Sequence, residues 1–247
     1  MSQAPPLLVV QMGSPSDVLR RQLGEQSDWF RAALRDQTQN IIVVRPDLQE
    51  ELPDESDFSA AVITGSWSMV TDHDDWSERT GAWAKGLIES GKPLLGVCYG
   101  HQLMADVMGG VVDYHPDGRE LGTLPITLNA QGQADPFFGQ LPRVFNAHLT
   151  HMQSVLTPPP GAQALGSSAH DAYQILRYGP NVLSVQFHPE FTVQILQAIV
   201  DARETVLGEE GIDLSELRSG IKEAPFAQQV LLMFARMYED GRSLVSP

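Results

Sequence analysis

Cys98 stands between two glycines, Gly96 and Gly100, where a short apolar run gives way to a helical pattern. A glycine-x-nucleophile-x-glycine sequence at such a junction is typical of a nucleophile elbow, here with cysteine in place of serine. The tight turn directs the side chain outward, and the N-terminal end of the following helix favours the thiolate, which is the reactive form. The pattern predicts that Cys98 is a nucleophile in acyl transfer, and the alternative is a small buried structural residue.

A cysteine nucleophile needs a base, and the base needs a group that orients it. His188 and Glu190 come at the end of an apolar run, with Pro189 between them. In an extended chain, residues i and i+2 point the same way. The spacing therefore predicts that Glu190 holds one imidazole nitrogen while the other faces Cys98. The alternative is an ordinary hydrogen-bonded or exposed histidine.

The elements that must position these residues alternate over the first 110 residues. Short apolar runs typical of strands lie at residues 7–12, 41–44, 60–64 and 93–97. A helical or broken-helical pattern lies at residues 17–35, and helical patterns lie at residues 76–90 and 99–108. Such alternation predicts parallel strands with right-handed crossovers and helices on both faces of the sheet.

The rest of the chain shows two other patterns. Strand-like runs separated by proline and glycine predict an antiparallel extension, and they lie at residues 123–128, 143–147, 163–166, 173–178 and 182–187. Beyond Glu190, two apolar stripes predict helices, one of Val193, Leu196, Ile199, Val200 and Leu207, the other of Phe226, Val230, Leu231, Phe234, Met237 and Tyr238. We expect residues 208–220 to be a surface connection. The fold class expected is α/β, with a doubly wound, mostly parallel central sheet, helices on both faces and a small antiparallel extension.

The composition of the chain restricts the partners and the compartment that we expect. The 247 residues include 16 basic and 31 acidic side chains, for a net charge of −15. An acidic chain repels phosphate groups, so we expect neither nucleic acid nor an anionic membrane as a partner. The apolar runs are far shorter than the roughly 18 residues of a membrane helix, and residues 1–6 lack the basic region of a signal peptide. The single cysteine excludes a disulfide framework and a multi-cysteine zinc site, and it fits a reducing, cytoplasmic compartment.

Residues 96–102, Gly-Val-Cys-Tyr-Gly-His-Gln, together with residues 187–190, Phe-His-Pro-Glu, resemble the class I glutamine amidotransferase family. The form resembled is a stand-alone domain like the amidotransferase domain of GMP synthases. The order of the segments also fits, with His188 lying 90 positions after Cys98. Supporting similarity lies at residues 63–66, 72–76, 118–122 and 150–155, and the whole resemblance covers about residues 7–191. It implies the flavodoxin-like fold of that family.

The resemblance implies a role for each matching residue. Cys98 would be the nucleophile, His188 the general base and acid, and Glu190 the residue that orients His188. The backbone N–H groups of Gly65 and Tyr99 would form the oxyanion hole.

The resemblance also implies how the substrate is held. Gln102, four residues after Cys98 and on the same helix face, would contact glutamine. Backbone around Thr150, Met152 and Gln153 would hold its α-amino and α-carboxylate groups. The family often has glycine where Met152 stands and aspartate where Gln153 stands, a departure that bears on the choice of substrate.

The activity implied is cysteine-dependent hydrolysis of the glutamine side-chain amide through a γ-glutamyl thioester. Ammonia would pass to a separate acceptor enzyme, such as a synthetase subunit, because the sequence lacks a Gly-x-x-x-x-Gly-Lys-Ser/Thr phosphate loop. Two alternatives stay open. One is a γ-glutamyl peptidase or hydrolase that acts on γ-glutamyl conjugates, and the other is a non-catalytic binding or regulatory module on the same fold.

Residues 1–191 are expected to form an amidotransferase-like catalytic domain, and residues 192–247 helices that pack on it. The resemblance calls for no cofactor and no metal. We expect His101 at the helix surface, and no metal-type spacing is visible among His73, His115, His148 and His170.

Overall fold

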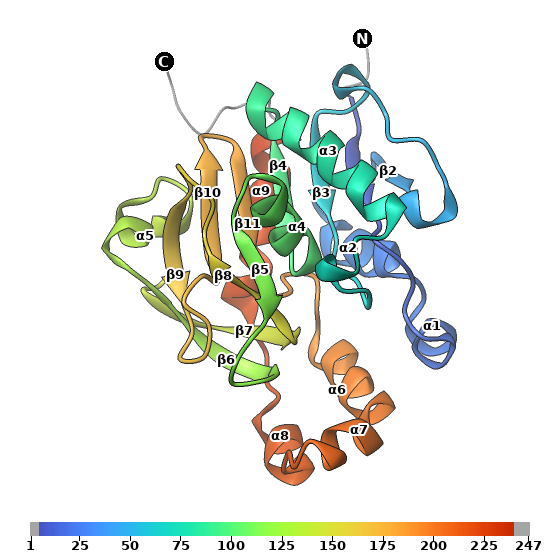
Figure 1. Ribbon diagram of the computed structural model, residues 1–247, viewed down its shortest axis with the longest axis vertical. Coiled ribbons are helices and arrows are strands. Elements are labelled where there is room, and N and C mark those ends of the chain that lie inside the picture. The colour runs from blue at the N-terminus through green and yellow to red at the C-terminus, as the bar shows by residue number, and fades with distance from the viewer. Residues whose placement is uncertain (1–4, 240–247) are drawn as a thin grey trace.

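A nine-stranded sheet runs through the middle of the computed structural model, which describes residues 5–239 (Figure 1). Its strand order is β2-β1-β3-β4-β11-β10-β9-β6-β7. The first five strands pair in parallel, and they are β2 (Ile41–Val44), β1 (Leu7–Val10), β3 (Ala60–Ile63), β4 (Leu94–Val97) and β11 (Val182–Val185). All but β2 are buried along their whole length. Apolar strands of this kind are stable because helices cover both faces of a parallel sheet.

The other four strands continue the same sheet in antiparallel pairing, and they are β10 (Ile175–Gly179), β9 (Gln163–Ser167), β6 (Glu120–Leu128) and β7 (Val144–His151). A separate two-stranded sheet pairs β5 (Val111–Tyr114) with β8 (Gln153–Thr157). The predicted antiparallel extension is therefore present, although β5 and β8 were not predicted. The run at residues 182–187 was expected in that extension, but it forms β11, which pairs in parallel with β4 and in antiparallel with β10, so the two parts of the sheet meet there. The predicted α/β fold class is confirmed.

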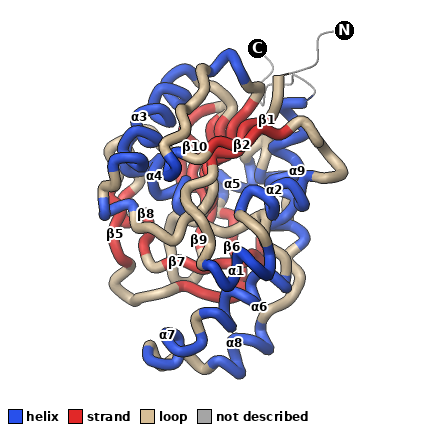
Figure 2. The backbone as a smooth tube through the Cα atoms, turned by 90° about the vertical axis from the view of Figure 1, so that its right-hand side faces the viewer, coloured by secondary structure: helices blue, strands red, loops and turns tan. Residues whose placement is uncertain are grey.

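Helices lie on both faces of the sheet (Figure 2). On one face, α3 (Asp75–Ser90) and α4 (Tyr99–Val107) share an apolar cluster with Leu8 and Val10 of β1. On the other face, α2 (Gln26–Leu34) and α9 (Pro225–Glu239) share a cluster with Leu7 and Val9. Alternate residues of one strand thus serve opposite cores, as the period-two geometry of a strand requires.

A third group of helices lies at one end of the molecule, at the bottom of Figure 1. It comprises α6 (Val193–Ala202), α7 (Glu204–Glu209) and α8 (Leu214–Gly220). A third apolar cluster joins Leu196 and Leu207 of this group to Leu19 of α1 (Asp17–Leu23). The short α5 (Ala130–Ala134) packs against β9. Single 3-10 turns occur at Pro46–Leu48, Glu55–Asp57, Val70–Asp72 and Phe138–Gln140.

The broken-helical alternative at residues 17–35 is confirmed, because Gly24 adopts a φ of +79° and ends the first of two helices. Two other local expectations were wrong. Residues 208–220 include the helix α8, whose N-terminal N–H groups bond to the Asp213 side chain. Phe226 is exposed, whereas the other residues of its predicted stripe are buried or half-buried.

The predicted domain boundary at residue 191 falls between β11 and α6. Beyond it, α6 contacts α1, and α9 contacts β7 and α2. Residues 1–4 and 240–247 of the two predicted units lie outside the described residues, and the division stays a prediction. Within residues 5–239, every helix is too short or too polar to cross a membrane.

Candidate active site

The turn between β4 and α4 holds Cys98 in an unusual backbone conformation, with φ +50° and ψ −98°. Two long-range hydrogen bonds fix this turn. The Cys98 N–H donates to the Val185 carbonyl at 2.9 Å, and the Gly100 N–H donates to the Thr64 carbonyl at 3.1 Å. A strained residue persists only where its surroundings hold it, and such positions cluster at functional sites.

The two flanking glycines are required by close packing of strand and helix. A Cβ atom at Gly96 would lie 2.7 Å from the Gly100 carbonyl oxygen. A Cβ atom at Gly100 would lie 2.5 Å from the Ile63 carbonyl oxygen and 2.9 Å from the Ile63 Cβ. Both distances are too short for any side chain, so the elbow depends on glycine at each position.

The Gly100→Ala variant is expected to lower the free energy of unfolding by about 1–3 kcal/mol, because the added methyl group must displace the backbone of β3. The measurement is urea denaturation followed by circular dichroism. Gly86→Ala in α3 is the matched control. A Cβ there meets nothing within 4 Å, so we expect stabilisation of about 0.5–1 kcal/mol. Equal midpoints for the two variants would contradict the packing argument.

His188 follows β11 and is held on two sides. Its Nδ1 lies 2.8 Å from Oε1 of Glu190, and its ring stacks on Phe191 with centroids 3.9 Å apart. Its backbone N–H donates to the His148 carbonyl at 2.9 Å. The carboxylate and the aromatic ring together fix the direction in which Nε2 points.

The structure brings Cys98 and His188 together beside Gly65. A Cβ atom at Gly65 would lie 2.9 Å from His188 Cε1 and 3.6 Å from Cys98 Cβ. The two residues meet because β4 and β11 are parallel neighbours, with Val97 paired to Val185, so their carboxyl ends share one edge of the sheet. His188 Nε2 has no hydrogen-bond partner within residues 5–239.

The charge of His188 is set by competing effects. Burial of the ring opposes the protonated form, but Glu190 and the Cys98 sulfur outweigh it and raise the pKa of His188 to about 10. At neutral pH the ring therefore carries a proton. Because the folded pKa lies above the ordinary 6.5, this interaction stabilises the fold below pH 6.5, and the contribution is lost as the pH rises to about 10.

The Glu190→Gln variant is expected to lower the pKa of His188 by about 1–3, because a neutral amide no longer stabilises the imidazolium. The measurement is an NMR titration of the His188 Cε1–H signal. The exposed His73, which pairs with Glu78 at 2.8 Å, provides an internal control whose titration is expected to stay unchanged. An unaltered His188 titration would mean that Glu190 does not stabilise its charge.

Gly65 and Tyr99, whose N–H groups were expected to form the oxyanion hole, both lie beside Cys98. Within residues 5–239 neither group donates to a carbonyl or side chain. The Tyr99 side chain points into the core, where its hydroxyl lies 2.6 Å from the Ser77 hydroxyl and its ring stacks on Trp76. The backbone of Tyr99 is thus anchored beside Cys98, as an oxyanion-binding group must be.

A pocket of about 150 Å³ opens beside Cys98. Every substrate-contact residue expected from the sequence lines it, namely Gln102, Thr150, Met152 and Gln153. The opposite wall comes from the segment after Gly65, residues 66–69. Cys98 is only 5% exposed, and it borders this pocket.

Gln102 and Gln153 also form hydrogen bonds with other residues of the chain. The Gln102 amide nitrogen donates to the Gln153 carbonyl and, at 3.0 Å, to Oε1 of Gln186. The Gln153 side chain accepts from the Val70 N–H at 3.1 Å and donates to the Thr71 hydroxyl at 2.6 Å. Gln153, the first residue of β8, therefore links that strand to the 3-10 turn Val70–Asp72, which follows the pocket-lining residues 66–69.

Two arginines for which the sequence predicted no function also line the pocket. Arg119 donates through Nε and Nη2 to both carboxylate oxygens of Glu210, each at 2.9 Å. Arg203, between α6 and α7, donates to the Thr150 hydroxyl at 3.0 Å. Arg119 lay in a segment of supporting similarity, but Arg203 lies in no motif, so its position carried no signal.

His101 is buried, which corrects the expectation of a surface position. Its Nδ1 lies 2.7 Å from the Ser184 hydroxyl of β11. Burial lowers the pKa of His101 to about 3, so the ring is neutral. The expectation was wrong because α4 lies under β5 and β8 as well as against the main sheet.

A buried group of Glu120, His151 and Asp171 has ligand atoms within 4.8 Å of one another, a spacing that could hold a metal ion. Two members of this group, Glu120 and His151, already form hydrogen bonds. His151 Nε2 lies 2.8 Å from Glu120 Oε2, and the Gln174 amide donates to the same oxygen at 2.7 Å. The group fastens the strand edges beside the pocket.

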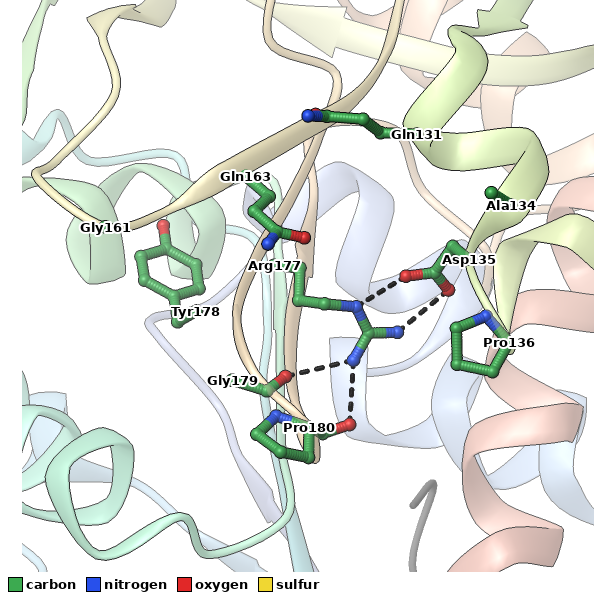
Figure 3. A pocket seen from close by; sticks show the side chains of 10 residues that line it. All are labelled: Gln131, Ala134, Asp135, Pro136, Gly161, Gln163, Arg177, Tyr178, Gly179 and Pro180. Atoms are coloured by element: carbon green, nitrogen blue, oxygen red, sulfur yellow. Dashed lines mark hydrogen bonds and ion pairs between the residues drawn. The ribbon is translucent and has the colours of Figure 1, made fainter.

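A larger hollow of about 500 Å³ lies between α5 and the β10–β11 turn (Figure 3). Arg177 there pairs with both oxygens of Asp135 at 2.6 and 2.8 Å and donates to the carbonyls of Gly179 and Pro180. Neither Cys98 nor His188 lines this hollow. With its charges already paired, it offers little to a substrate.

Comparison with known proteins agrees with this geometry. A family model described as glutamine amidotransferase class-I matches residues 27–200. The chain belongs to the class I glutamine amidotransferase family, as the sequence resemblance indicated.

Three known proteins illustrate the similarity within this family. The chain is 30% identical over 183 residues to gamma-glutamyl peptidase 5 of Arabidopsis thaliana, covering 72% of this chain and 67% of the relative. It is 33% identical over 121 residues to a glutamine-hydrolyzing GMP synthase of Aeropyrum pernix, covering 47% of this chain and 22% of the synthase. A glutamine amidotransferase crystal structure from Thermotoga maritima has the same fold, with a TM-score of 0.74 at 17% identity, covering 96% of this chain and 97% of the other.

Proposed function

We propose that this chain hydrolyses γ-glutamyl amide bonds by nucleophilic catalysis at Cys98, through a γ-glutamyl thioester. The observation that carries the proposal is the grouping of Cys98, His188 and Glu190, in which Cys98 lines a pocket of about 150 Å³. The thiolate attacks the γ-carbonyl carbon, and the N–H groups of Gly65 and Tyr99 stabilise the oxyanion. The departing amine takes the His188 proton, and water then hydrolyses the thioester to glutamate.

The charges around His188 fit both halves of this reaction. Before acylation, the thiolate and Glu190 hold a proton on the ring, which is the form that can protonate the leaving amine. The thioester carries no charge, so acylation removes one of the two interactions that raise the pKa of His188. After the amine leaves, the neutral ring can take a proton from the attacking water.

Two substrate classes are supported. Gamma-glutamyl peptidase 5 matches over most of its length, whereas the match to the GMP synthase covers about a fifth of that chain. We therefore favour γ-glutamyl conjugates as substrates. The GMP synthase match favours a second candidate, hydrolysis of glutamine with ammonia passed to a separate synthetase subunit.

We also propose that residues 1–191 form the catalytic domain and that the C-terminal helices of residues 192–247 complete its pocket. Arg203 and Val206 support this division of roles, because both lie beyond residue 191 and both line the pocket beside Cys98.

The test is a panel of glutamine, γ-glutamyl dipeptides and the matching α-glutamyl dipeptides, scored for ammonia or amine release by the purified chain. We expect release from γ-linked but not α-linked compounds, with dipeptides turned over faster than glutamine. Faster turnover of glutamine would favour the second candidate. No release from any compound would favour a non-catalytic module.

A further inference from the structure

Arg203 lines the pocket beside Cys98, the proposed nucleophile, and its positive charge has no carboxylate partner within residues 5–239. Its hydrogen bond to the Thr150 hydroxyl is neutral, and no carboxylate within residues 5–239 lies within 4.0 Å of its guanidinium. Arg203 is half-buried, and burial lowers the pKa of its guanidinium, which stays charged in proteins. A partly desolvated guanidinium is costly unless an anion pairs with it, and its planar fork suits a carboxylate.

Arg119, the other arginine of the pocket, shows the contrast. Both oxygens of Glu210 accept its hydrogen bonds at 2.9 Å, so its charge is already neutralised. Arg203 feels Glu210 and the Cys98 sulfur only at longer range. Of the two arginines, Arg203 is therefore the one whose charge remains available to a ligand.

The position of Arg203 indicates which part of a ligand it would meet. It lines the pocket beside Cys98 and also a smaller hollow that borders His188, Gly65 and Trp67 but not Cys98. Of the expected glutamyl contacts, Gln102, Met152 and Gln153 line only the first of these spaces, whereas Thr150 lines both. Because the leaving amine must lie within reach of His188 to be protonated, the wall that also borders the His188 hollow, which includes Arg203, is the part nearest the leaving group.

We propose that Arg203 binds a carboxylate on the leaving half of the substrate, and so selects γ-glutamyl amino acids and peptides over glutamine. The proposal rests on the hydrolysis of γ-glutamyl amides proposed above. Arg203 lies at the end of α6, beyond residues 27–200, the part matched by the family model.

The experiment compares two compounds that differ only in this charge, γ-glutamylglycine and γ-glutamylglycinamide. Hydrolysis by the wild-type chain is measured as kcat/KM, and binding to the Cys98→Ala variant is measured by calorimetry. We expect the wild-type chain to favour the carboxylate compound roughly 10- to 100-fold in both assays, the range of a charge-assisted hydrogen-bonded pair. Arg203→Gln is expected to abolish the preference, and Arg203→Lys to retain part of it.

The matched control is Arg218→Gln. Arg218 is an exposed arginine of the same helical group, paired with Asp201 and Glu204 and remote from the pocket. This variant is expected to keep the full preference. Circular dichroism checks that each variant is folded.

Several outcomes would overturn the inference. An equal loss on both compounds in Arg203→Gln would place Arg203 at the glutamyl half or at the thiolate, and an unchanged preference would show that it contacts no carboxylate. Absence of binding by either compound would also overturn it. Failure of the proposed function looks different, because the binding preference would then persist while the wild-type chain hydrolyses neither compound.

Discussion

The Cys98→Ser variant is expected to release amine from γ-glutamyl substrates at least about 10⁴-fold more slowly than the wild-type chain. The hydroxyl group fits the same space, but it does not ionise at neutral pH and cannot form the anion that His188 stabilises. The measurement is kcat from quenched time courses of amine release. Mass spectrometry of the wild-type chain during turnover is expected to detect the γ-glutamyl adduct on Cys98.

Because serine conserves the volume of cysteine, the variant is expected to keep the urea midpoint of the wild-type chain within error. A loss of activity can then be assigned to chemistry and not to unfolding. Turnover within tenfold of the wild type would rule out Cys98 as the nucleophile.

The second large effect is expected for His188→Asn, which we predict to lower kcat by about 10³- to 10⁶-fold. Asparagine can neither protonate the leaving amine nor take a proton from water. It also removes the positive charge next to Cys98, so alkylation of the thiol by iodoacetamide at pH 7 is expected to slow as well. Both the turnover and the alkylation rate are measured.

The control for this prediction is His73→Asn, which removes an exposed histidine outside the pocket and is expected to leave both rates unchanged. Glu190→Gln should fall between the two, because Glu190 orients and charges the ring but transfers no proton. A larger loss for Glu190→Gln than for His188→Asn would reverse the proposed roles.

Local chemistry explains why the central part of the site could be predicted from the sequence. The elbow at Cys98 requires only a strand, a tight turn with glycines and a helix, and all of these lie within residues 94–107. The pairing of His188 with Glu190 requires only an extended chain, and the two side chains are 2.8 Å apart in the structure. The meeting of the strand ends before Cys98 and His188 was not predicted, because residues 182–187 were expected in the antiparallel extension and not beside β4.

The surroundings of the site could not be predicted in the same way. The burial of His101 depends on β5 and β8, whose pairing with each other joins segments about forty residues apart. The Gln153 side chain forms hydrogen bonds with Val70 and Thr71, which lie more than eighty residues earlier in the sequence. Helical periodicity gives one apolar face, but it does not reveal which other elements will cover the rest.

The amino-acid sequence by itself determined the α/β architecture and indicated Cys98 and His188 as the proposed nucleophile and base, because each depends on patterns within one or two neighbouring elements. Only the tertiary structure decided that the C-terminal helices return to the pocket and bring Arg203 to it, 105 positions after Cys98. That placement comes from apolar packing of α6 and α7 against α1 and the aromatic residues behind His188. Apolar packing is non-directional, so the identity of a single charged residue does not reveal where the packing will carry it.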